Sequence, residues 1–246
     1  LQVEDFDASI ASLNRARSLE ADNTAVLFAL GTAHFRKGNY EKASDFLESG
    51  LEIEPDNPGA LFDLGNTYFK LDQFETAIAQ YERSVALDPE FWPSVNNIGL
   101  VEYEQGDIEA AINRWEDSLE IAPMEPEPEL AIAVAKFAQG QEAAALEIGI
   151  PALERDSRYA EIQFLIDNLW GPELIEDTEA FFNHPDVQAV YIATPHPMHA
   201  EWTIKAAEAG KHILVEKPIG LNAAEARAMI DAAAKHDVFL MEAFMY

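Results

Sequence analysis

The sequence predicts a two-part molecule: an α-helical solenoid of paired helices over residues 1–170, then an incomplete parallel α/β segment. Two observations carry this prediction. Turn-type residues recur with a period of 34 at Gly38, Asp72, Gly106 and Gly140. Beyond these residues the helical period gives way to short β-branched runs separated by helical stretches. Such a period is typical of a helix-turn-helix unit that buries its apolar face only by stacking on its neighbours.

The composition sets the class of protein. With 246 residues, 48% of them hydrophobic, the chain has room for a repeat array and one further domain. No apolar run reaches the roughly 18 to 20 residues that cross a bilayer. The sequence contains no cysteine, which excludes disulfides, cysteine-ligated zinc and thiol catalysis. This usage fits a reducing compartment, and we expect a cytoplasmic protein.

The charge balance is strongly acidic. Lys and Arg number 16 against 45 Asp and Glu, so that the formal net charge is -29. This field repels phosphate backbones, and nucleic acid is therefore not an expected partner. Two interpretations of the acidity stay open: it attracts a cationic partner, or the acidic outer faces simply keep a solenoid in solution.

The first element is an isolated helix. Residues 3–22 match only the second helix of a unit, with Phe6, Leu13 and Ala16 at the expected places. Its partner helix is missing, and the sequence begins with Leu1 in place of methionine. Terminal repeats normally present a polar outer face. We therefore expect a fragment of a longer array.

Three consecutive units follow, at residues 24–57, 58–91 and 92–125. They share one pattern of small and large residues, in which small residues sit where two helices cross and large ones fill the spaces between. In the first unit the pattern reads Leu27, Leu30, Gly31, His34, Ala43, Leu47, Gly50 and Pro55. This pattern resembles the tetratricopeptide repeat family, whose members bind protein segments.

A degenerate unit and a closing helix end the array. Residues 126–158 keep the register, but Gly149 replaces a large residue and Pro151 is expected to interrupt the second helix. Residues 159–169 carry apolar side chains at helical spacing and are predicted to form a closing helix.

The resemblance implies that the first helix of each unit lines a concave groove. The residues that it places there are Phe28, Phe35, Phe62, Asn66, Phe69, Lys70, Asn96 and Tyr103. Aromatic rings commonly anchor peptides, and the asparagine amides would be free to pair with a peptide backbone. The alternative is that the phenylalanines face a neighbouring unit as core, because an aromatic stripe at helical spacing usually packs.

Two positions of the predicted groove differ from the family pattern, and this difference indicates the kind of partner. The resemblance implies that members which clamp an acidic peptide tail do so with lysine and arginine beside asparagines. Here Phe62 and Glu127 stand at two of those basic sites. We therefore expect a protein or peptide partner with apolar anchors and positive charge.

The second part begins with a connecting helix over residues 171–185. The run 187–193 is apolar on both faces and predicts a buried parallel strand. A helix, a strand, a helix and a strand are then predicted at residues 199–209, 212–216, 222–235 and 238–241, with Asn222 as the cap of the second helix. This is a β-α-β-α-β order over 186–246, and right-handed crossovers would make it half of a doubly wound nucleotide-binding sheet.

Three motifs carry a closer resemblance. Ala193-Thr194-Pro195 with His199, Glu216-Lys217-Pro218 and Glu242-Ala243-Phe244-Met245-Tyr246 together resemble the glucose-fructose oxidoreductase and inositol dehydrogenase family (Gfo/Idh/MocA) over residues 183–246. Within it they are similar to dihydrodiol dehydrogenase-type members. The resemblance implies NAD or NADP as the cofactor.

The resemblance also implies residue roles. Thr194 and Pro195 would border the dinucleotide, with His199 as a helix-entry residue on the cofactor side. In the Glu216-Lys217-Pro218 motif, Glu216 would meet the nicotinamide ribose hydroxyls. Lys217 would be the catalytic residue, since an ammonium beside a developing alkoxide stabilises charge or donates a proton. No metal is expected at His196 and His199, because no carboxylates stand near them in the sequence.

Several parts of that family are missing. The sequence has no Gly-x-Gly-x-x-Gly turn, and Tyr246 ends it where a substrate domain would begin. We expect doubtful cofactor binding and no hydride transfer by the chain as written, which would then be a protein-binding scaffold. The alternative is a fragment of a functional NAD(P)-dependent dehydrogenase acting on a sugar, polyol or diol. A third possibility, compatible with either of these, is that two unrelated reading frames are joined between about residues 169 and 186.

Overall fold

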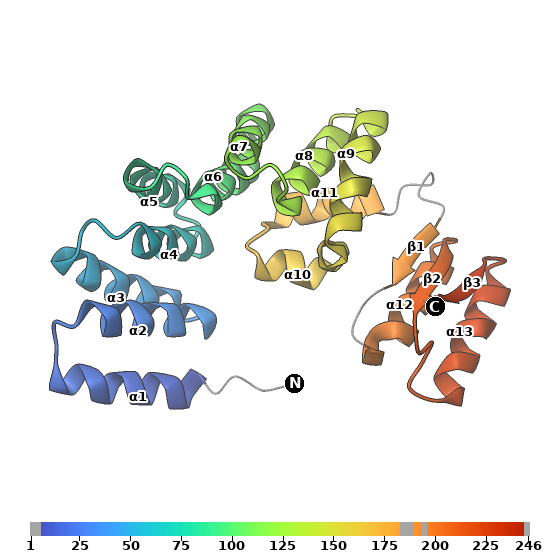
Figure 1. Ribbon diagram of the computed structural model, residues 1–246, viewed down its shortest axis with the longest axis horizontal. Coiled ribbons are helices and arrows are strands. Elements are labelled where there is room, and N and C mark those ends of the chain that lie inside the picture. Colours follow the sequence, from blue (N-terminus) through green and yellow to red (C-terminus); the bar gives the residue numbers. More distant parts are fainter. Residues whose placement is uncertain (1–5, 183–188, 193–195, 244–246) are drawn as a thin grey trace.

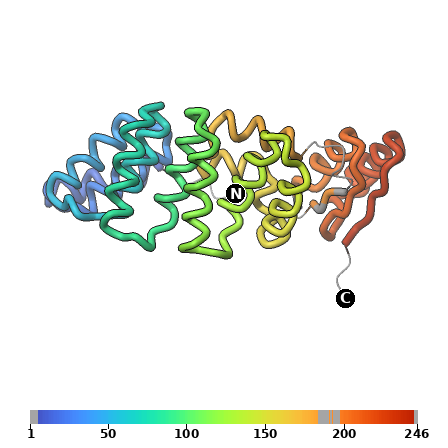
Figure 2. Tube along the Cα trace, turned by 90° about the horizontal axis from the view of Figure 1, so that it is seen from above, coloured from blue at the N-terminus to red at the C-terminus, as the bar shows by residue number. Residues whose placement is uncertain are grey.

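The computed structural model describes residues 6–182, 189–192 and 196–243. It contains two bodies, an α-helical array and a smaller α/β body that follows it along the chain (Figure 1). Seen from above, the helices of the array follow one another in a row, with the smaller body beyond their end (Figure 2). The predicted fold class is thereby confirmed.

The array is a succession of helix pairs. It starts with α1 (Phe6–Leu19), which has no partner among the described residues before it. The pairs are α2 (Thr24–Arg36) with α3 (Tyr40–Ile53), α4 (Pro58–Lys70) with α5 (Phe74–Leu87), α6 (Trp92–Glu104) with α7 (Ile108–Ile121), and α8 (Pro126–Ala138) with α9 (Glu142–Arg155). Each pair lies within one of the predicted units.

The residues that recur with a period of 34 form the turns between the two helices of each unit. Gly38, Gly106 and Gly140 have φ angles of 79°, 82° and 77° between the two helices of their units. Asp72 holds the same place with φ 57°. Glycine adopts this left-handed conformation without a steric penalty, and aspartate tolerates it better than most residues.

A second set of glycines lets the paired helices cross closely. A methyl group on Gly31 would lie 2.6 Å from Cγ of Leu47, and one on Gly65 would lie 2.5 Å from Cε1 of Tyr81. A methyl group on Gly99 would lie 2.6 Å from Nε1 of Trp115. In each unit, therefore, the glycine of the first helix leaves room for a large side chain of the second helix.

The degenerate unit departs from the sequence prediction. Pro151 lies inside α9 without interrupting it, so that expectation is wrong. The ring stands on the exposed side of the helix, where water can hydrate the carbonyl that lost its N–H partner. The buried face of α9 carries Gly149, whose missing side chain makes room for Phe181.

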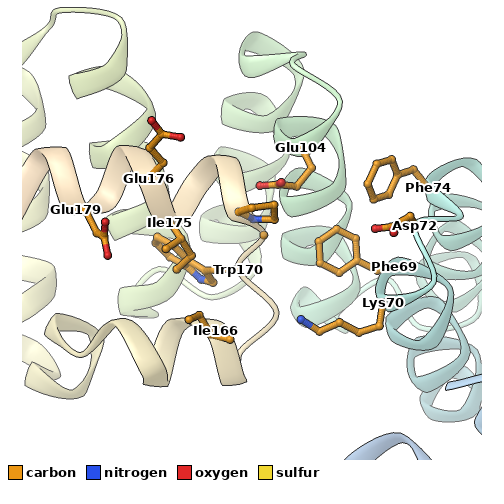
Figure 3. A pocket seen from close by; sticks show the side chains of 12 residues that line it. Phe69, Lys70, Asp72, Phe74, Glu104, Ile166, Trp170, Ile175, Glu176 and Glu179 are labelled. Atoms are coloured by element: carbon orange, nitrogen blue, oxygen red, sulfur yellow. The ribbon is translucent and has the colours of Figure 1, made fainter. Parts of the chain in front are cut away.

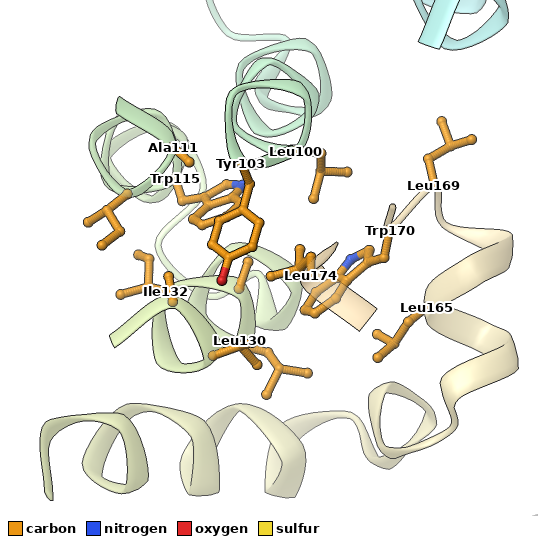
Figure 4. Packing of buried hydrophobic residues seen from close by; sticks show 14 of the residues in the cluster. Leu100, Tyr103, Ala111, Trp115, Leu130, Ile132, Leu165, Leu169, Trp170 and Leu174 are labelled. Carbon is orange, nitrogen blue, oxygen red and sulfur yellow. The ribbon is translucent and has the colours of Figure 1, made fainter. Parts of the chain in front are cut away.

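The end of the array is built differently from the predicted single closing helix. It consists of a short 3₁₀ helix, η1 (Ser157–Ala160), and α10 (Ile162–Asp167). Helix α11 (Pro172–Phe182) then runs back and packs against α6 and α8. In Figure 4, Trp170 and Leu174 meet residues of the array. The connecting helix is thus part of the core of the array.

The smaller body has the predicted β-α-β-α-β order. Its elements are β1 (Ala189–Ile192), η2 (His196–Met198), α12 (His199–Glu208), β2 (His212–Glu216), α13 (Ala223–Lys235) and β3 (Leu240–Ala243). The strands are parallel in the order β1-β2-β3, with Val190 opposite Ile213 and Val215 opposite Glu242. Asn222 caps α13 as predicted, since its Oδ1 accepts from the backbone N–H groups of Ala224 and Glu225.

The two bodies have separate hydrophobic cores. The core of the smaller body consists of Ile192, Ala207, Ile213, Val215 and Met229. Among the described residues, no helix is long and apolar enough to cross a membrane.

Candidate functional site

Asn66 and Asn96, which were expected on the groove, are linked to each other through Asn97. Tyr81 OH donates to Oδ1 of Asn66 at 2.7 Å, and Nδ2 of Asn97 donates to the same oxygen at 2.9 Å. Asn96 Nδ2 donates to Oδ1 of Asn97 at 3.1 Å. All three asparagines are buried. The expectation that their amides are free for a peptide backbone is therefore wrong in this structure, because the amides link neighbouring units.

This chain of hydrogen bonds ends on a buried carboxylate, that of Glu127 in α8. Its oxygens accept from Nδ2 of Asn96 at 3.4 Å, Nε1 of Trp170 at 3.2 Å and the hydroxyl of Tyr159 at 3.4 Å. Burial raises the pKa of Glu127 to about 7, against the lowering effect of the three donors. Glu127 thereby ties α6 and the closing segment to α8.

Helix α11 is seated by polar contacts as well as by packing. The carboxylate of Glu104 accepts from the backbone N–H groups of Glu173 at 3.2 Å and Leu174 at 3.1 Å. These groups belong to the first turn of the helix, where a negative charge is favourable. The hydroxyl of Tyr103 donates to Oδ2 of Asp177 at 2.5 Å.

Two of the predicted groove residues are therefore covered. Tyr103 is 3% exposed and Asn96 is 1% exposed. Neither offers a free surface to a partner: α11 contacts Tyr103, and Asn96 bonds to Asn97 and Glu127. The buried residues of α11 are Leu174, Thr178 and Phe181, at positions i, i+4 and i+7. This spacing is typical of any amphipathic helix, so the sequence alone did not indicate that α11 docks on the array.

The predicted aromatic residues pack within the array. Phe28 lies against Gly50, where a methyl group would come within 2.3 Å of Cε1 of the ring. The ring centroids of Phe35 and Tyr40 are 5.4 Å apart, those of Phe62 and Phe91 5.3 Å, and those of Phe69 and Phe74 5.8 Å. Much of the surface of each ring is therefore packed inside the array, as the alternative interpretation predicts. Phe69 is buried, whereas the other three predicted rings are half-buried.

An open cavity of about 730 Å³ remains between the second unit and the closing segment (Figure 3). One wall belongs to α4, α5 and their turn, and the other to α10 and α11. The lining residues are Phe69, Lys70, Asp72, Phe74, Glu104, Ile166, Trp170, Gly171, Pro172, Ile175, Glu176 and Glu179. The cavity thus contains two of the predicted groove residues, Phe69 and Lys70.

Carboxylates dominate the charge of this cavity. Asp72, Glu104, Glu176 and Glu179 face one lysine, Lys70, among the lining residues. Burial lowers the pKa of Lys70, and the carboxylates of Asp167, Glu104 and Asp72 oppose this shift. Burial also raises the pKa of Glu104. The cavity therefore combines an aromatic and aliphatic surface with a net negative charge.

The smaller body gathers part of the predicted cofactor site at one edge of its sheet. Glu216 ends β2 and precedes Lys217 and Pro218, which are exposed. His199 begins α12 as expected, and its Nδ1 lies 2.9 Å from the carbonyl oxygen of Pro218. The Lys217–Pro218 peptide bond is cis.

Two of the predicted cofactor residues, Thr194 and Pro195, lie outside the described residues. A carboxylate that was not predicted braces the loop after β2: Oε1 of Glu242 accepts from the backbone N–H of Ile219 at 2.8 Å. In the described ranges, no group of three or more His, Asp or Glu side chains could hold a metal ion.

Comparisons with protein families match both parts. Residues 23–90 and 62–126 match two tetratricopeptide repeat models. Residues 138–244 match the oxidoreductase family with an NAD-binding Rossmann fold, GFO_IDH_MocA. This match begins at the last residue of α8, so it includes α9, α10 and α11, although these helices pack in the array.

Curated relatives resemble the second part. Trans-1,2-dihydrobenzene-1,2-diol dehydrogenase of Xenopus laevis is 35% identical over 92 residues, which are 37% of this chain and 26% of that protein. Levoglucosan dehydrogenase of Pseudarthrobacter phenanthrenivorans is 46% identical over 70 residues, which are 28% of this chain and 18% of that protein. The chain thus spans about a quarter or less of these relatives.

Solved structures resemble the array. The crystal structure of MamA aligns with a TM-score of 0.57 and 24% identity over 63% of this chain and 91% of that one. YrrB, described as a TPR protein with an unusual peptide-binding site, aligns with a TM-score of 0.52 and 19% identity over 68% of this chain and 85% of that one. At these identities the likeness shows the fold alone.

Proposed function

We propose that this chain, which joins tetratricopeptide repeats to part of a Gfo/Idh/MocA NAD-binding domain, is a protein-interaction scaffold. Its partner is a polypeptide segment with apolar anchors and basic side chains. The cavity between the second unit and α11 carries this proposal, because it pairs an apolar surface with four carboxylates and one lysine.

The chemistry of the cavity favours such a segment. Its volume, about 730 Å³, falls within the range of natural binding pockets, roughly 300 to 1,000 Å³. Phe74, Ile166 and Ile175 offer apolar contact to one or two anchoring side chains. The carboxylates around them attract lysine or arginine, and a net charge of -29 steers a basic partner toward the chain.

Labelled peptides test the proposal. One amphipathic peptide of about 16 residues carries leucine, phenylalanine and lysine, and a matched peptide carries glutamate in place of lysine. We expect fluorescence anisotropy to detect binding of the basic peptide and much weaker binding of the acidic one. Equal affinity for both peptides, or no binding of either, would contradict the proposal.

A paired substitution places the binding in the cavity. Asp72→Asn keeps a residue that tolerates the left-handed turn but removes one carboxylate. We expect it to weaken binding of the basic peptide by about threefold to tenfold. Asp117→Asn, at an exposed position on α7, makes the same change in net charge and should leave the affinity unaltered. An equal loss of peptide affinity in the two variants would show that binding depends on the net charge of the chain and not on the cavity.

A second candidate function is hydride transfer by a dehydrogenase of which this chain is a part, acting on a sugar, polyol or diol with NAD or NADP. The observation that favours it is the gathering of His199 and the Glu216-Lys217-Pro218 loop at one sheet edge. In that function Glu216 would bind ribose hydroxyls, and Lys217 would stabilise the charge that develops on the substrate oxygen.

For this chain we propose weak dinucleotide binding and no turnover, because its sequence lacks the glycine-rich turn that holds the pyrophosphate. Titration with NAD and NADP and their reduced forms tests this point. Tight binding that Lys217→Ala weakens, or oxidation of levoglucosan or a dihydrodiol by the purified chain, would favour the dehydrogenase.

A further inference from the structure

We infer that α11 is a displaceable wall of the partner site, and that a basic segment in the cavity holds it in its docked position. This inference rests on the proposed function and specifies its regulation. Partner binding and α11 docking would then strengthen each other, so that the partner controls the helix that leads into the NAD-binding part of the chain.

The first observation is the composition of the cavity. Seven of its twelve lining residues belong to the closing segment, from Ile166 to Glu179. They include Trp170, Ile175 and Glu176 (Figure 3). Four of them, Pro172, Ile175, Glu176 and Glu179, belong to α11 itself, so that an α11 that left its position would remove two apolar side chains and two carboxylates from the cavity. The site therefore exists in full only while α11 is docked.

The second observation is the like charge of the two walls. Asp72 belongs to the array, whereas Glu176 and Glu179 belong to α11 and are exposed at the cavity. Carboxylates on facing walls repel each other, and this repulsion opposes the docking of α11. Lysine or arginine side chains between the walls would replace repulsion with attraction.

The third observation is that α11 is a short helix of 11 residues whose first two turns are held by polar contacts. Three buried side chains, Leu174, Thr178 and Phe181, fix the apolar face. Glu104 and Tyr103 hold the first two turns. Glu104 also lines the cavity, so that one residue contacts both the helix and the space for the partner. A short helix at the end of the array, held partly by polar contacts, can exchange between docked and undocked positions.

The reporter for docking is a single cysteine. The chain has no cysteine, so in a Thr178→Cys variant the rate of reaction with a thiol reagent reports exposure at one position. Thr178 is fully buried on the packed face of α11, and its hydroxyl bonds within the helix, to the carbonyl of Leu174. A cysteine of similar size fits the same space.

The basic peptide described above serves as the probe. At a saturating concentration we expect it to slow the reaction of the introduced thiol by about fivefold or more, the range of ordinary coupling between sites. The matched acidic peptide should leave the rate unchanged. A faster reaction with the basic peptide would show that the peptide displaces α11, and an unchanged rate would show that docking and binding are independent. Either result overturns the inference.

Removal of the α11 carboxylates separates this coupling from a merely structural effect. In the Thr178→Cys background, Glu176→Gln with Glu179→Gln should slow the reaction in the absence of peptide, because the repulsion between the walls falls. The same pair should weaken peptide binding by about tenfold. Glu116→Gln with Glu120→Gln, exposed on α7, is the control of equal charge and should change neither quantity. Slowed labelling without weakened binding, or the reverse, would contradict the mechanism.

Hydrogen exchange provides a second readout if the cysteine variant does not fold. Amides of residues 172–182 in the unaltered chain should exchange more slowly with the basic peptide bound. The two proposals then fail in different ways. If anisotropy shows no binding, the proposed function fails. If the peptide binds while labelling and exchange of α11 stay the same, the inference fails and the proposed function stands.

Discussion

At the scale of single residues, the closing end of the array depends on Glu127. Its carboxylate is the meeting point of donors from α6, η1 and the segment just before α11. Burial of an ionised carboxylate costs free energy, because desolvation disfavours its charged form. The three donors reduce this cost without cancelling it, as the raised pKa of Glu127 shows.

Glu127→Gln should make the array more stable at alkaline pH. The pKa of Glu127 is about 7 in the folded chain and 4.5 in an ordinary environment. Between these values the folded chain keeps a proton that the unfolded chain releases, so the free energy of unfolding falls as pH rises. Glutamine carries no such penalty. We expect a gain on the order of 2 kcal/mol at about pH 8, shrinking toward about pH 5.

Urea unfolding at both pH values measures this difference. Glu116→Gln, at an exposed position on α7, is the control and should show no comparable pH dependence. A difference between Glu127→Gln and the unaltered chain that is the same at acidic and alkaline pH would show that Glu127 does not titrate in this range.

Gly99→Ala should destabilise the third unit. The new methyl group would lie 2.6 Å from Nε1 of Trp115, which is fully buried and donates to the carbonyl of Asn96. The indole cannot move aside without losing that bond, and overpacking of this kind costs about 1 to 3 kcal/mol. Gly59→Ala in α4 is the matched control, because the nearest atom to its methyl group is 3.6 Å away. Urea unfolding that ranks the two variants in the opposite order would contradict the close crossing.

At the scale of elements, the sequence predicted what is local and repeated. The turn at Gly38 and the helix crossing at Gly65 depend on residues within one unit. Because these residues recur with the 34-residue period, they can be recognised in the sequence. The cap at Asn222 likewise depends on neighbours within three positions. These features need no knowledge of the rest of the chain.

The place of α11 could not be derived in the same way. Its N-terminus meets Glu104, a residue 70 positions before Leu174. Nothing local distinguishes a linker helix from one that returns to the groove, because both need an apolar stripe. The sequence placed Tyr103 and Asn96 on an open groove, whereas Tyr103 bonds to Asp177 of α11 and the buried Asn96 bonds to Glu127 of α8. The four cavity residues that α11 contributes were not predicted either.

Glu104→Ala should loosen α11 at its first turn. The backbone N–H groups of Glu173 and Leu174 would lose their acceptor, and loss of such a cap costs about 1 to 2 kcal/mol. Amides of α11 should then exchange faster with solvent, while those of α2 and α3 keep their rates. Glu116→Ala on the exposed side of α7 serves as the control. Unchanged exchange in α11 would mean that packing alone seats the helix.

At the scale of the whole molecule, the array and the smaller body have separate hydrophobic cores among the described residues. The core of the array consists of one cluster between Leu47 and Leu64 and a larger one between Phe69 and Phe181, whereas the core of the smaller body holds the three-stranded sheet against its helices. The smaller body has few buried side chains, and β1 has β2 as its one partner among the described strands. A body of about 60 residues buries a smaller fraction of its surface than a larger domain does and is marginally stable by itself.

The chain should therefore unfold in two steps, with the smaller body first. Met229 and Leu130 are both fully buried, one in each core. Truncation of a buried methionine or leucine to alanine costs about 2 to 5 kcal/mol. In differential scanning calorimetry, Met229→Ala should lower the first transition and leave the second in place, whereas Leu130→Ala should lower the second and leave the first. A single transition that both substitutions shift together would show that the two cores unfold as one, and that the smaller body takes its stability from the array.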